Sequence, residues 1–416
     1  MNSSPSRIVI SGVGAVTAFG MGTGALWRGL GGGLCGIRPI TLFDTASRPF
    51  KLAGEVPDFN PASVLGPKGL RLVDRTGLLA LCAFHEALAD AGLQPETPAM
   101  DETGVILGTT MASTASLGSF ISQMQRQGPR SVNPAHFPNT VGNSPAGQVS
   151  IRFGIRGCNL TVSSGFASSF DAMETAARML RQGRLQVALA GGVEELSEWT
   201  ATAFAETGLL SPGASGGKEH CAPFDLDRNG TILGEGSVVF ALELEEHARA
   251  RGIEPRAEYV GGNVRFSAQA APDNPSPQPA LVRTIRSLLE QHRLAPADID
   301  LVVSGASGHP RGDAWEARAI LDSLDAAARI PVLAPKSQLG ETFSASGAIQ
   351  MAAALFALEH GTLSPTPGFA TPDPACPVDC VPGQPRQTRA TTALVTAATP
   401  LFHQAACILR AIPCTG

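Results

Sequence analysis

The chain of 416 residues has few charged side chains and no long apolar run. Asp, Glu, Lys and Arg make up 16% of it, below the roughly 25% that is usual for soluble domains. This low charge indicates that a partner protein buries a large surface. No stretch approaches the roughly 18 uninterrupted apolar residues of a membrane span. We therefore expect no association with a membrane.

Basic runs and paired cysteines are also missing. The formal net charge is −5, and no cluster of Lys and Arg alternates with aromatic residues, which excludes nucleic acid as a partner. The eight cysteines are scattered without a CxxC pair, and Cys376 and Cys380 alone are a poor indication of a metal site. We therefore expect reduced thiols, a cytoplasmic protein, no metal and no other cofactor.

Short β-type runs alternate with amphipathic runs along the chain, and 43% hydrophobic residues with 46 glycines are typical of a tightly packed α/β protein. Apolar spacings of three and four predict helices at 72–91, 116–127, 170–182, 201–206, 279–292, 314–324 and 344–360. Strands are predicted at 8–13, 105–108, 159–162, 187–191, 237–244, 257–264, 301–304, 332–335, 392–396 and 406–409. This alternation predicts a parallel-rich sheet with helices on both faces. The pattern restarts after residue 250, which predicts two duplicated halves, 1–250 and 251–416.

Five segments, in this order and spacing, resemble the β-ketoacyl synthase family. They read RIVISGVGAVTAFG, DRTGLLALCAFHEALADAGL, ALAGGVEELS, CAPFDLDRNGTILGEGS and PKSQLGETFSASGAIQMAAAL. The resemblance extends from Arg7 to about Leu409, which is nearly the whole chain. It implies an α/β protein of thiolase-like fold, in which two duplicated α/β halves form five αβαβα layers.

The chemistry of that family needs one cysteine and two histidines. The cysteine, at a helix N-terminus that favours a thiolate, carries the acyl chain. The histidines assist decarboxylation of the malonyl unit and stabilise its enolate. By resemblance these positions fall on Phe166 in TVSSGFASS, Gly305 in VVSGASGHPRGDAWEA and Glu341 in PKSQLGE. Phenylalanine cannot form a thioester, and an ionised glutamate opposes an enolate.

A fourth difference concerns the glycine-rich Gly-Phe-Gly-Gly-type loop near the end of the family's sequences. Residues 398–402 read ATPLF here, without a glycine and with Pro400. A loop with this composition does not follow the same backbone course, so we expect the oxyanion-binding geometry to be lost as well.

Other side chains could replace the missing groups. Ser163, Ser164 or Ser168 could be a relocated nucleophile, and His309 could act from a shifted turn; the chain would then be a diverged acyltransferase. No Ser-His-Asp arrangement can be argued from the sequence. The serines are better explained as small residues around a tight turn, and His309 as an exposed histidine in a turn. Phe166 is expected to be a packing residue that fills the former catalytic pocket.

A family member without the cysteine and both histidines resembles the chain length factor of a type II polyketide synthase. The resemblance implies a subunit without catalysis of its own. It pairs with an intact ketosynthase, works with an acyl carrier protein and shapes the tunnel that sets product length. Many such factors carry glutamine where Phe166 stands, which points to an unusual subgroup, one serving reduced or polyene-type chains. An inert homodimer that binds acyl carrier protein is a further alternative.

The resemblance also implies an interface and a gate. In the family, the strand before the nucleophile pairs antiparallel with its copy in the partner, with a helical segment beside it. The corresponding residues are Asn159, Leu160, Thr161, Val162, Pro134 and Phe137. The expected gate of the acyl tunnel consists of Thr114, Leu117 and Ile121, with Gly118 beside them. Their spacing places the first three on one helical face, and the small Thr114 and Gly118 leave room for a longer product. An ordinary interface helix is the alternative.

Overall fold

The computed structural model describes residues 7–212, 217–267, 278–324, 330–399 and 403–413. The strands of its main sheet are β1 (Ile8–Thr17), β2 (Gly20–Met21), β5 (Thr103–Gly108), β6 (Asn159–Val162), β7 (Val187–Glu194), β8 (Gly236–Leu244), β9 (Ala257–Phe266), β10 (Leu301–Val303), β11 (Pro331–Leu333), β13 (Asp379–Cys380), β15 (Thr392–Ala398) and β16 (His403–Ala411). Two small ribbons pair β3 (Arg38–Pro39) with β4 (Leu52–Ala53), and β12 (Thr362–Leu363) with β14 (Arg386–Gln387).

The helices carry the rest of the described regular structure. They are α1 (Thr23–Gly31), α2 (Ala62–Leu65), α3 (Arg75–Asp90), α4 (Thr114–Gln127), α5 (Ser144–Phe153), α6 (Ser168–Arg181), α7 (Glu198–Ala205), α8 (Glu245–Ala250), α9 (Gln278–Gln291), α10 (Pro310–Ser323), α11 (Lys336–Leu339) and α12 (Ser344–His360). Two short 3₁₀ turns matter below, η3 (Pro134–Thr140) and η4 (Gly165–Ala167). No described helix combines the length and the apolar character that crossing a membrane requires.

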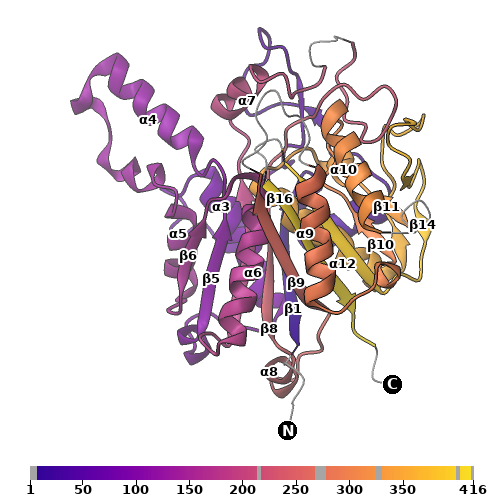
Figure 1. Cartoon of the computed structure of the whole chain (residues 1–416). Helices are drawn as coiled ribbons and strands as arrows, with labels where there is room; N and C mark the ends of the chain where they lie inside the picture. The colour runs from indigo at the N-terminus through magenta and orange to yellow at the C-terminus, as the bar shows by residue number, and fades with distance from the viewer. Residues whose placement is uncertain (1–6, 213–216, 268–277, 325–329, 400–402, 414–416) are drawn as a thin grey trace.

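The two halves of the chain repeat one topology. The first half is ordered β1-β8-β7-β5-β6 and the second β9-β16-β15-β10-β11, and the halves join where β1 meets β9. In each half the first strand along the chain lies at this junction and the last strand lies beside it. The strand order therefore repeats, as expected for the duplication predicted from the sequence, and Figure 1 shows the two halves side by side.

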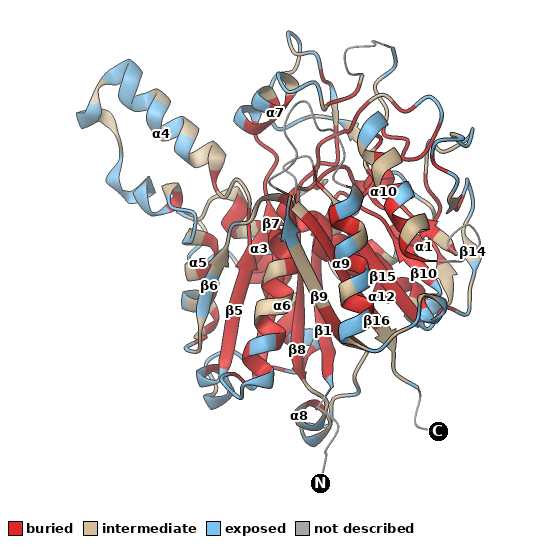
Figure 2. Cartoon of the chain, in the orientation of Figure 1, coloured by how far each residue is buried: buried red, intermediate tan, exposed pale blue. Residues whose placement is uncertain are grey.

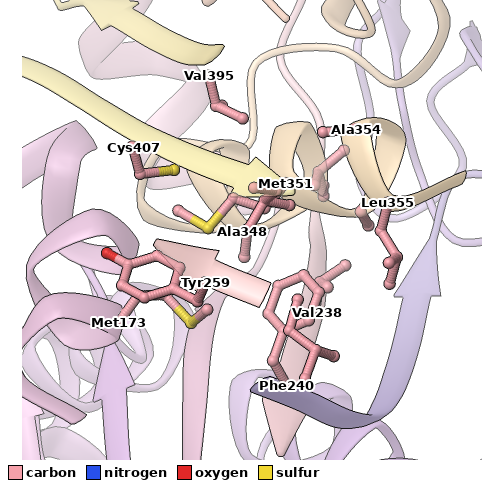
Figure 3. Packing of buried hydrophobic residues seen from close by; sticks show 14 of the residues in the cluster. Met173, Val238, Phe240, Tyr259, Ala348, Met351, Ala354, Leu355, Val395 and Cys407 are labelled. Carbon is pink, nitrogen blue, oxygen red and sulfur yellow. The ribbon is translucent and has the colours of Figure 1, made fainter. Parts of the chain in front are cut away.

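Helices cover and separate the two halves of this sheet, which forms layers. Helix α3 covers β1, β7 and β8, while α9 covers β9, β15 and β16. Between the halves lie α6 and α12, each of which contacts strands of both. This arrangement confirms the five αβαβα layers predicted from the sequence. Figure 3 shows the packing around the central layer, where Met173 of α6 and Met351 of α12 meet Tyr259 of β9.

The prediction of a parallel-rich sheet is wrong. Parallel pairs occur around β5 and β10, but the centre is antiparallel, with β8 pairing to β1 and β7, and β16 pairing to β9 and β15. The connection between the last two strands gives the physical reason for this antiparallel pairing. Only residues 399–402 separate β15 from β16 in the sequence, and so short a connection can join only antiparallel neighbours.

One helix stands apart from the layers. Helix α4 and the turns that follow it project from the body as an arm (Figure 1), and none of the residues of α4 is buried (Figure 2). A helix that buries nothing within its own chain gains little from tertiary packing. Its position therefore depends on the few contacts at its root.

Candidate functional site

Phe166 lies in η4, between β6 and α6, where the sequence predicts a lost nucleophile. Its side chain is buried, and its ring centroid lies 5.2 Å from that of Phe343 and 6.0 Å from that of Phe204. The rings of Phe204 and Phe343 are 4.9 Å apart. Three aromatic rings thus pack together where the family places a thiolate, in contact geometry that stabilises a core.

The nearby serines have structural partners. The Ser168 hydroxyl donates to the carbonyl oxygen of Gly165 and accepts the Ser164 N–H at 3.0 Å. The Ser164 hydroxyl donates to the Asp171 carboxylate. Ser163 is exposed. Within the described ranges, no histidine forms a hydrogen bond with any of the three, so the geometry lends no support to a relocated nucleophile.

Gly305 and Glu341, far apart in the sequence, line one cavity of about 120 Å³. Lys336 lies in the same wall, and its Nζ is 2.7 Å from Glu341 Oε2. Glu341 Oε1 accepts hydrogen bonds from Phe343 N at 2.9 Å and from Ser346 Oγ at 2.7 Å. Both carboxylate oxygens are therefore occupied, and the only lysine in this wall is neutralised by its neighbour.

The turn that carries Gly305 is held by two buried carboxyl groups. Gly305 N donates to Glu316 Oε1 at 2.8 Å, and burial raises the pKa of Glu316. Asp313 accepts the N–H groups of Ser307 and Gly308, and burial raises its pKa to about 6. A β-carbon on Gly305 would lie 3.0 Å from Ala397 Cα. Because β15 passes this close, the turn has little room for a histidine side chain.

His309 is half-buried and caps a helix, which corrects the expected exposed turn histidine. Helix α10 begins at Pro310, and His309 Nδ1 accepts the Gly312 N–H at 3.1 Å. Burial, together with Arg311 and Arg228, lowers the pKa of His309. The ring nitrogen that faces the helix is thus committed to the cap.

The loop that replaces the family's glycine-rich segment is described only in part. Ala398 and Thr399 line the cavity, while 400–402, with Pro400, lie outside the described residues. No three His, Cys, Asp or Glu side chains gather as metal ligands in the part of the chain that the structure describes. Cys376 and Cys380 are buried, and burial raises the pKa of each thiol to about 12, which disfavours the thiolate that binds metal.

The predicted gate lies on the arm. Leu117 and Ile121 of α4 are 42% and 40% exposed, and Met124 continues the same apolar stripe at 39%. Thr114, in the first turn, donates its hydroxyl to the Met111 carbonyl oxygen at 2.7 Å. We call Leu117, Ile121 and Met124 the α4 stripe. It is an apolar surface that a partner protein would cover.

Gly118 does not face open space, which corrects its predicted role. A β-carbon on Gly118 would lie 2.4 Å from the Trp199 indole, so this ring rests against the α4 backbone. Trp199, on α7, is 47% exposed. Position 199 carries a bulky residue, but nothing in the sequence indicates that α7 meets α4. A large side chain at 118 would displace the indole, so it cannot test a tunnel.

The predicted interface residues lie at one border of the molecule. Strand β6 ends the sheet and pairs only with β5 among the described strands. Leu160 in it is 37% exposed, and Ile151 of neighbouring α5 is 86% exposed. Pro134 and the exposed Phe137 belong to η3 in the arm, where Phe137 contacts Phe120 at 6.2 Å between ring centroids. An open strand edge beside apolar side chains is suited to pairing with another chain.

Known proteins are similar to this chain in sequence and in fold. Residues 5–248 match the family model "Beta-ketoacyl synthase, N-terminal domain", and residues 256–370 match "Beta-ketoacyl synthase, C-terminal domain". The ketoacyl synthase beta subunit of the tetracenomycin polyketide synthase from Streptomyces glaucescens is 36% identical over 402 residues, covering 95% of this chain and 96% of that protein.

Solved structures agree with these sequence matches. The ishigamide ketosynthase/chain length factor has a TM-score of 0.90 at 27% identity, over 99% of this chain and 100% of that one. A type II polyketide synthase acyl-carrier protein in complex with its ketosynthase, bound to the hexaketide, contains a chain with a TM-score of 0.89 at 26% identity, covering 98% and 100%.

Proposed function

Because the chain belongs to the β-ketoacyl synthase family, we propose that it is a chain length factor that pairs with an intact ketosynthase and has no catalysis of its own. The observation that carries this proposal is the state of the three catalytic positions. Phe166 packs in an aromatic cluster, Gly305 has no side chain, and Glu341 is bound to Lys336. No group in these places can hold an acyl chain or stabilise an enolate.

The proposed partners follow from the surface and from the relatives. The edge of β6 and the exposed Ile151 form a border that a ketosynthase subunit would cover. The similar ketosynthase complex contains an acyl-carrier protein, and we propose that the acyl carrier protein delivers the growing chain to the pair formed here. The low content of charged residues also supports a large buried interface.

The arm supports a role in setting product length. We propose that the α4 stripe, Thr114 and Trp199 lie across the interface, at the end of the partner's acyl tunnel. In the part of the chain that the structure describes, the apolar side chains of the α4 stripe and of Trp199 remain 39–47% exposed. The gate would then include Trp199, which replaces Gly118 of the sequence prediction.

We expect the isolated chain to remain unmodified after incubation with acyl-loaded and malonyl-loaded carrier protein. The reason is that no thiolate or imidazole occupies positions 166, 305 and 341. Intact-protein mass spectrometry checks this result. Phe166→Cys alone does not restore condensation, since Gly305 and Glu341 still lack imidazole groups. A stoichiometric acyl adduct on any residue would contradict the proposal and favour a diverged acyltransferase.

Thr114→Phe shortens the product made by the co-expressed pair, because the added ring fills space on the face shared with the α4 stripe. We expect the main product to lose at least one two-carbon unit, as measured by liquid chromatography and mass spectrometry. Ser119→Phe is the matched control. Ser119 lines the hollow between α4 and the turns of the arm and does not belong to the stripe. Equal product spectra for both variants, with the complex intact, would place the gate elsewhere.

A further inference from the structure

The first turn of α4 is capped by side chains from other elements. Its N-cap residue, Ser113, makes no side-chain cap hydrogen bond. Instead, Ala115 N donates to Glu195 Oε1 at 2.8 Å, and Ser116 Oγ donates to Asp74 Oδ2 at 3.0 Å. Glu195 directly follows β7, while Asp74 caps α3. Two carboxyl groups of the body thus hold the root of the arm.

The residue before Glu195 holds the loop that leads into the same root. Glu194 accepts hydrogen bonds from Thr110 N at 2.8 Å, Met111 N at 2.9 Å and Thr109 Oγ1 at 3.0 Å. Glu194 and Glu195 therefore fix successive parts of the segment 109–115 from the end of one strand. Because α4 buries none of its own residues, a change in these hydrogen bonds would alter the direction of the helix relative to the body.

We propose that Glu195 is the positioning residue of α4, which sets the direction of the α4 stripe by capping the helix from the end of β7. This inference rests on the proposed function, since the stripe matters for product length only if it forms part of the gate. Glu195 touches neither a substrate nor the stripe, so it acts through the helix.

The surroundings of Glu195 make this cap sensitive to pH. Its side chain is 1% exposed, Oε1 accepts the Ala115 N–H, and the Thr76 hydroxyl lies close to the carboxyl group. Asp74 faces it from the start of α3, and Glu235 faces it from the residue before β8. Arg75 is paired with Glu235, with Nε 2.7 Å from Oε2, and also interacts electrostatically with Glu195. The other charged groups close to Arg75 and the root are the carboxyls of Glu55 and Glu194.

Burial foremost, with Asp74 and Glu235, raises the pKa of Glu195 from 4.5 to about 7. The folded root therefore binds a proton that the unfolded chain releases between these two values. Stability from this proton is complete below pH 4.5 and is lost as pH rises to about 7. Above that pH a buried carboxylate faces two others, and the root opens more readily.

Hydrogen exchange of the full chain, paired with its ketosynthase, tests this inference on the peptide that contains Ala115. After correction for intrinsic exchange, wild-type protection falls as pH rises through about 7. Glu195→Gln keeps an oxygen acceptor and loses this pH dependence. Glu195→Ala also loses this pH dependence; at pH values below about 7 it exchanges roughly five to ten times faster than wild type, as expected for a lost helix cap, and its products spread over more chain lengths. Glu206→Gln, an exposed carboxyl at the end of α7, behaves as wild type.

Protection in Glu195→Ala equal to wild type would overturn the inference, as would a pH profile that Glu195→Gln leaves unchanged. If Glu195→Ala does not fold, the pH profiles of Glu195→Gln and wild type still test the role of Glu195.

A failure of the proposed chain length function would give a different set of results. In that case the root loosens as described, yet neither Thr114→Phe nor Glu195→Ala alters the products.

Discussion

Replacing Lys336 by methionine lowers the free energy of unfolding by about 3–5 kcal/mol, the range found when one member of a buried ion pair is removed. Lys336 and Glu341 are 8% and 3% exposed, and Lys336 Nζ lies 2.7 Å from Glu341 Oε2. The variant leaves the Glu341 carboxylate buried without its counter-charge. Urea unfolding of the purified protein measures the loss.

The matched control removes both charges. Lys336→Met combined with Glu341→Gln leaves no buried charge from this pair, and the amide retains an oxygen that can accept from Phe343 N and Ser346 Oγ. We expect the double variant to recover most of the lost stability. A Lys336→Met variant as stable as wild type would show that the pair contributes nothing and that the cavity admits enough water to solvate Glu341.

We expect Leu160→Arg to abolish co-purification with the ketosynthase and therefore also product formation. Leu160 lies in the edge strand β6 and is 37% exposed, so the isolated chain tolerates a longer side chain there. In a pair with an interface of roughly 2,000 Å² or more, the new charge would be buried opposite another strand without a partner. Light scattering of the co-expressed proteins checks for the mass of a one-to-one pair.

Leu34→Arg is the control for this result. Leu34 is 54% exposed, follows α1 and lies outside the β6 border. The same substitution there leaves the pair intact. A Leu160→Arg chain that still pairs normally would move the interface away from β6, whereas a wild-type chain that forms a stable dimer with itself would favour the scaffold homodimer.

Elements with strong local signals could be predicted from the sequence. Helix α12 was predicted with its observed bounds, because a long apolar run ends at a glycine in the left-handed region, Gly361. Helix α3 starts at Arg75, three residues later than predicted, because Asp74 accepts the Gly77 N–H. Helix α10 starts four residues earlier than predicted, because a histidine serves as its cap. The antiparallel centre of the sheet depends on contacts between distant segments, which periodicity does not reveal.

In the candidate site, too, local features could be predicted from the sequence, whereas contacts between distant segments could not. The absence of a cysteine and two histidines could be identified position by position through the family resemblance. What occupies the space could not, because the partners come from other elements: Phe204 and Phe343 around Phe166, and Trp199 over Gly118. The ion pair between Lys336 and Glu341 could have been predicted from the sequence. The two residues lie five positions apart across a short helix, and lysine and glutamate are rarely buried without a partner.

The arm, which we propose contacts the partner subunit, also affects the fate of a chain that finds no partner. Its helix buries no residue and its root is held by a few hydrogen bonds, so it opens locally at a small fraction of the cost of global unfolding. Proteases cleave segments that open in this way. An orphaned copy is thus expected to be cut first between residues 114 and 127, while a paired copy is shielded. The exposed arm would then also regulate the amount of this subunit, because surplus copies would be degraded until their number matches that of the partner.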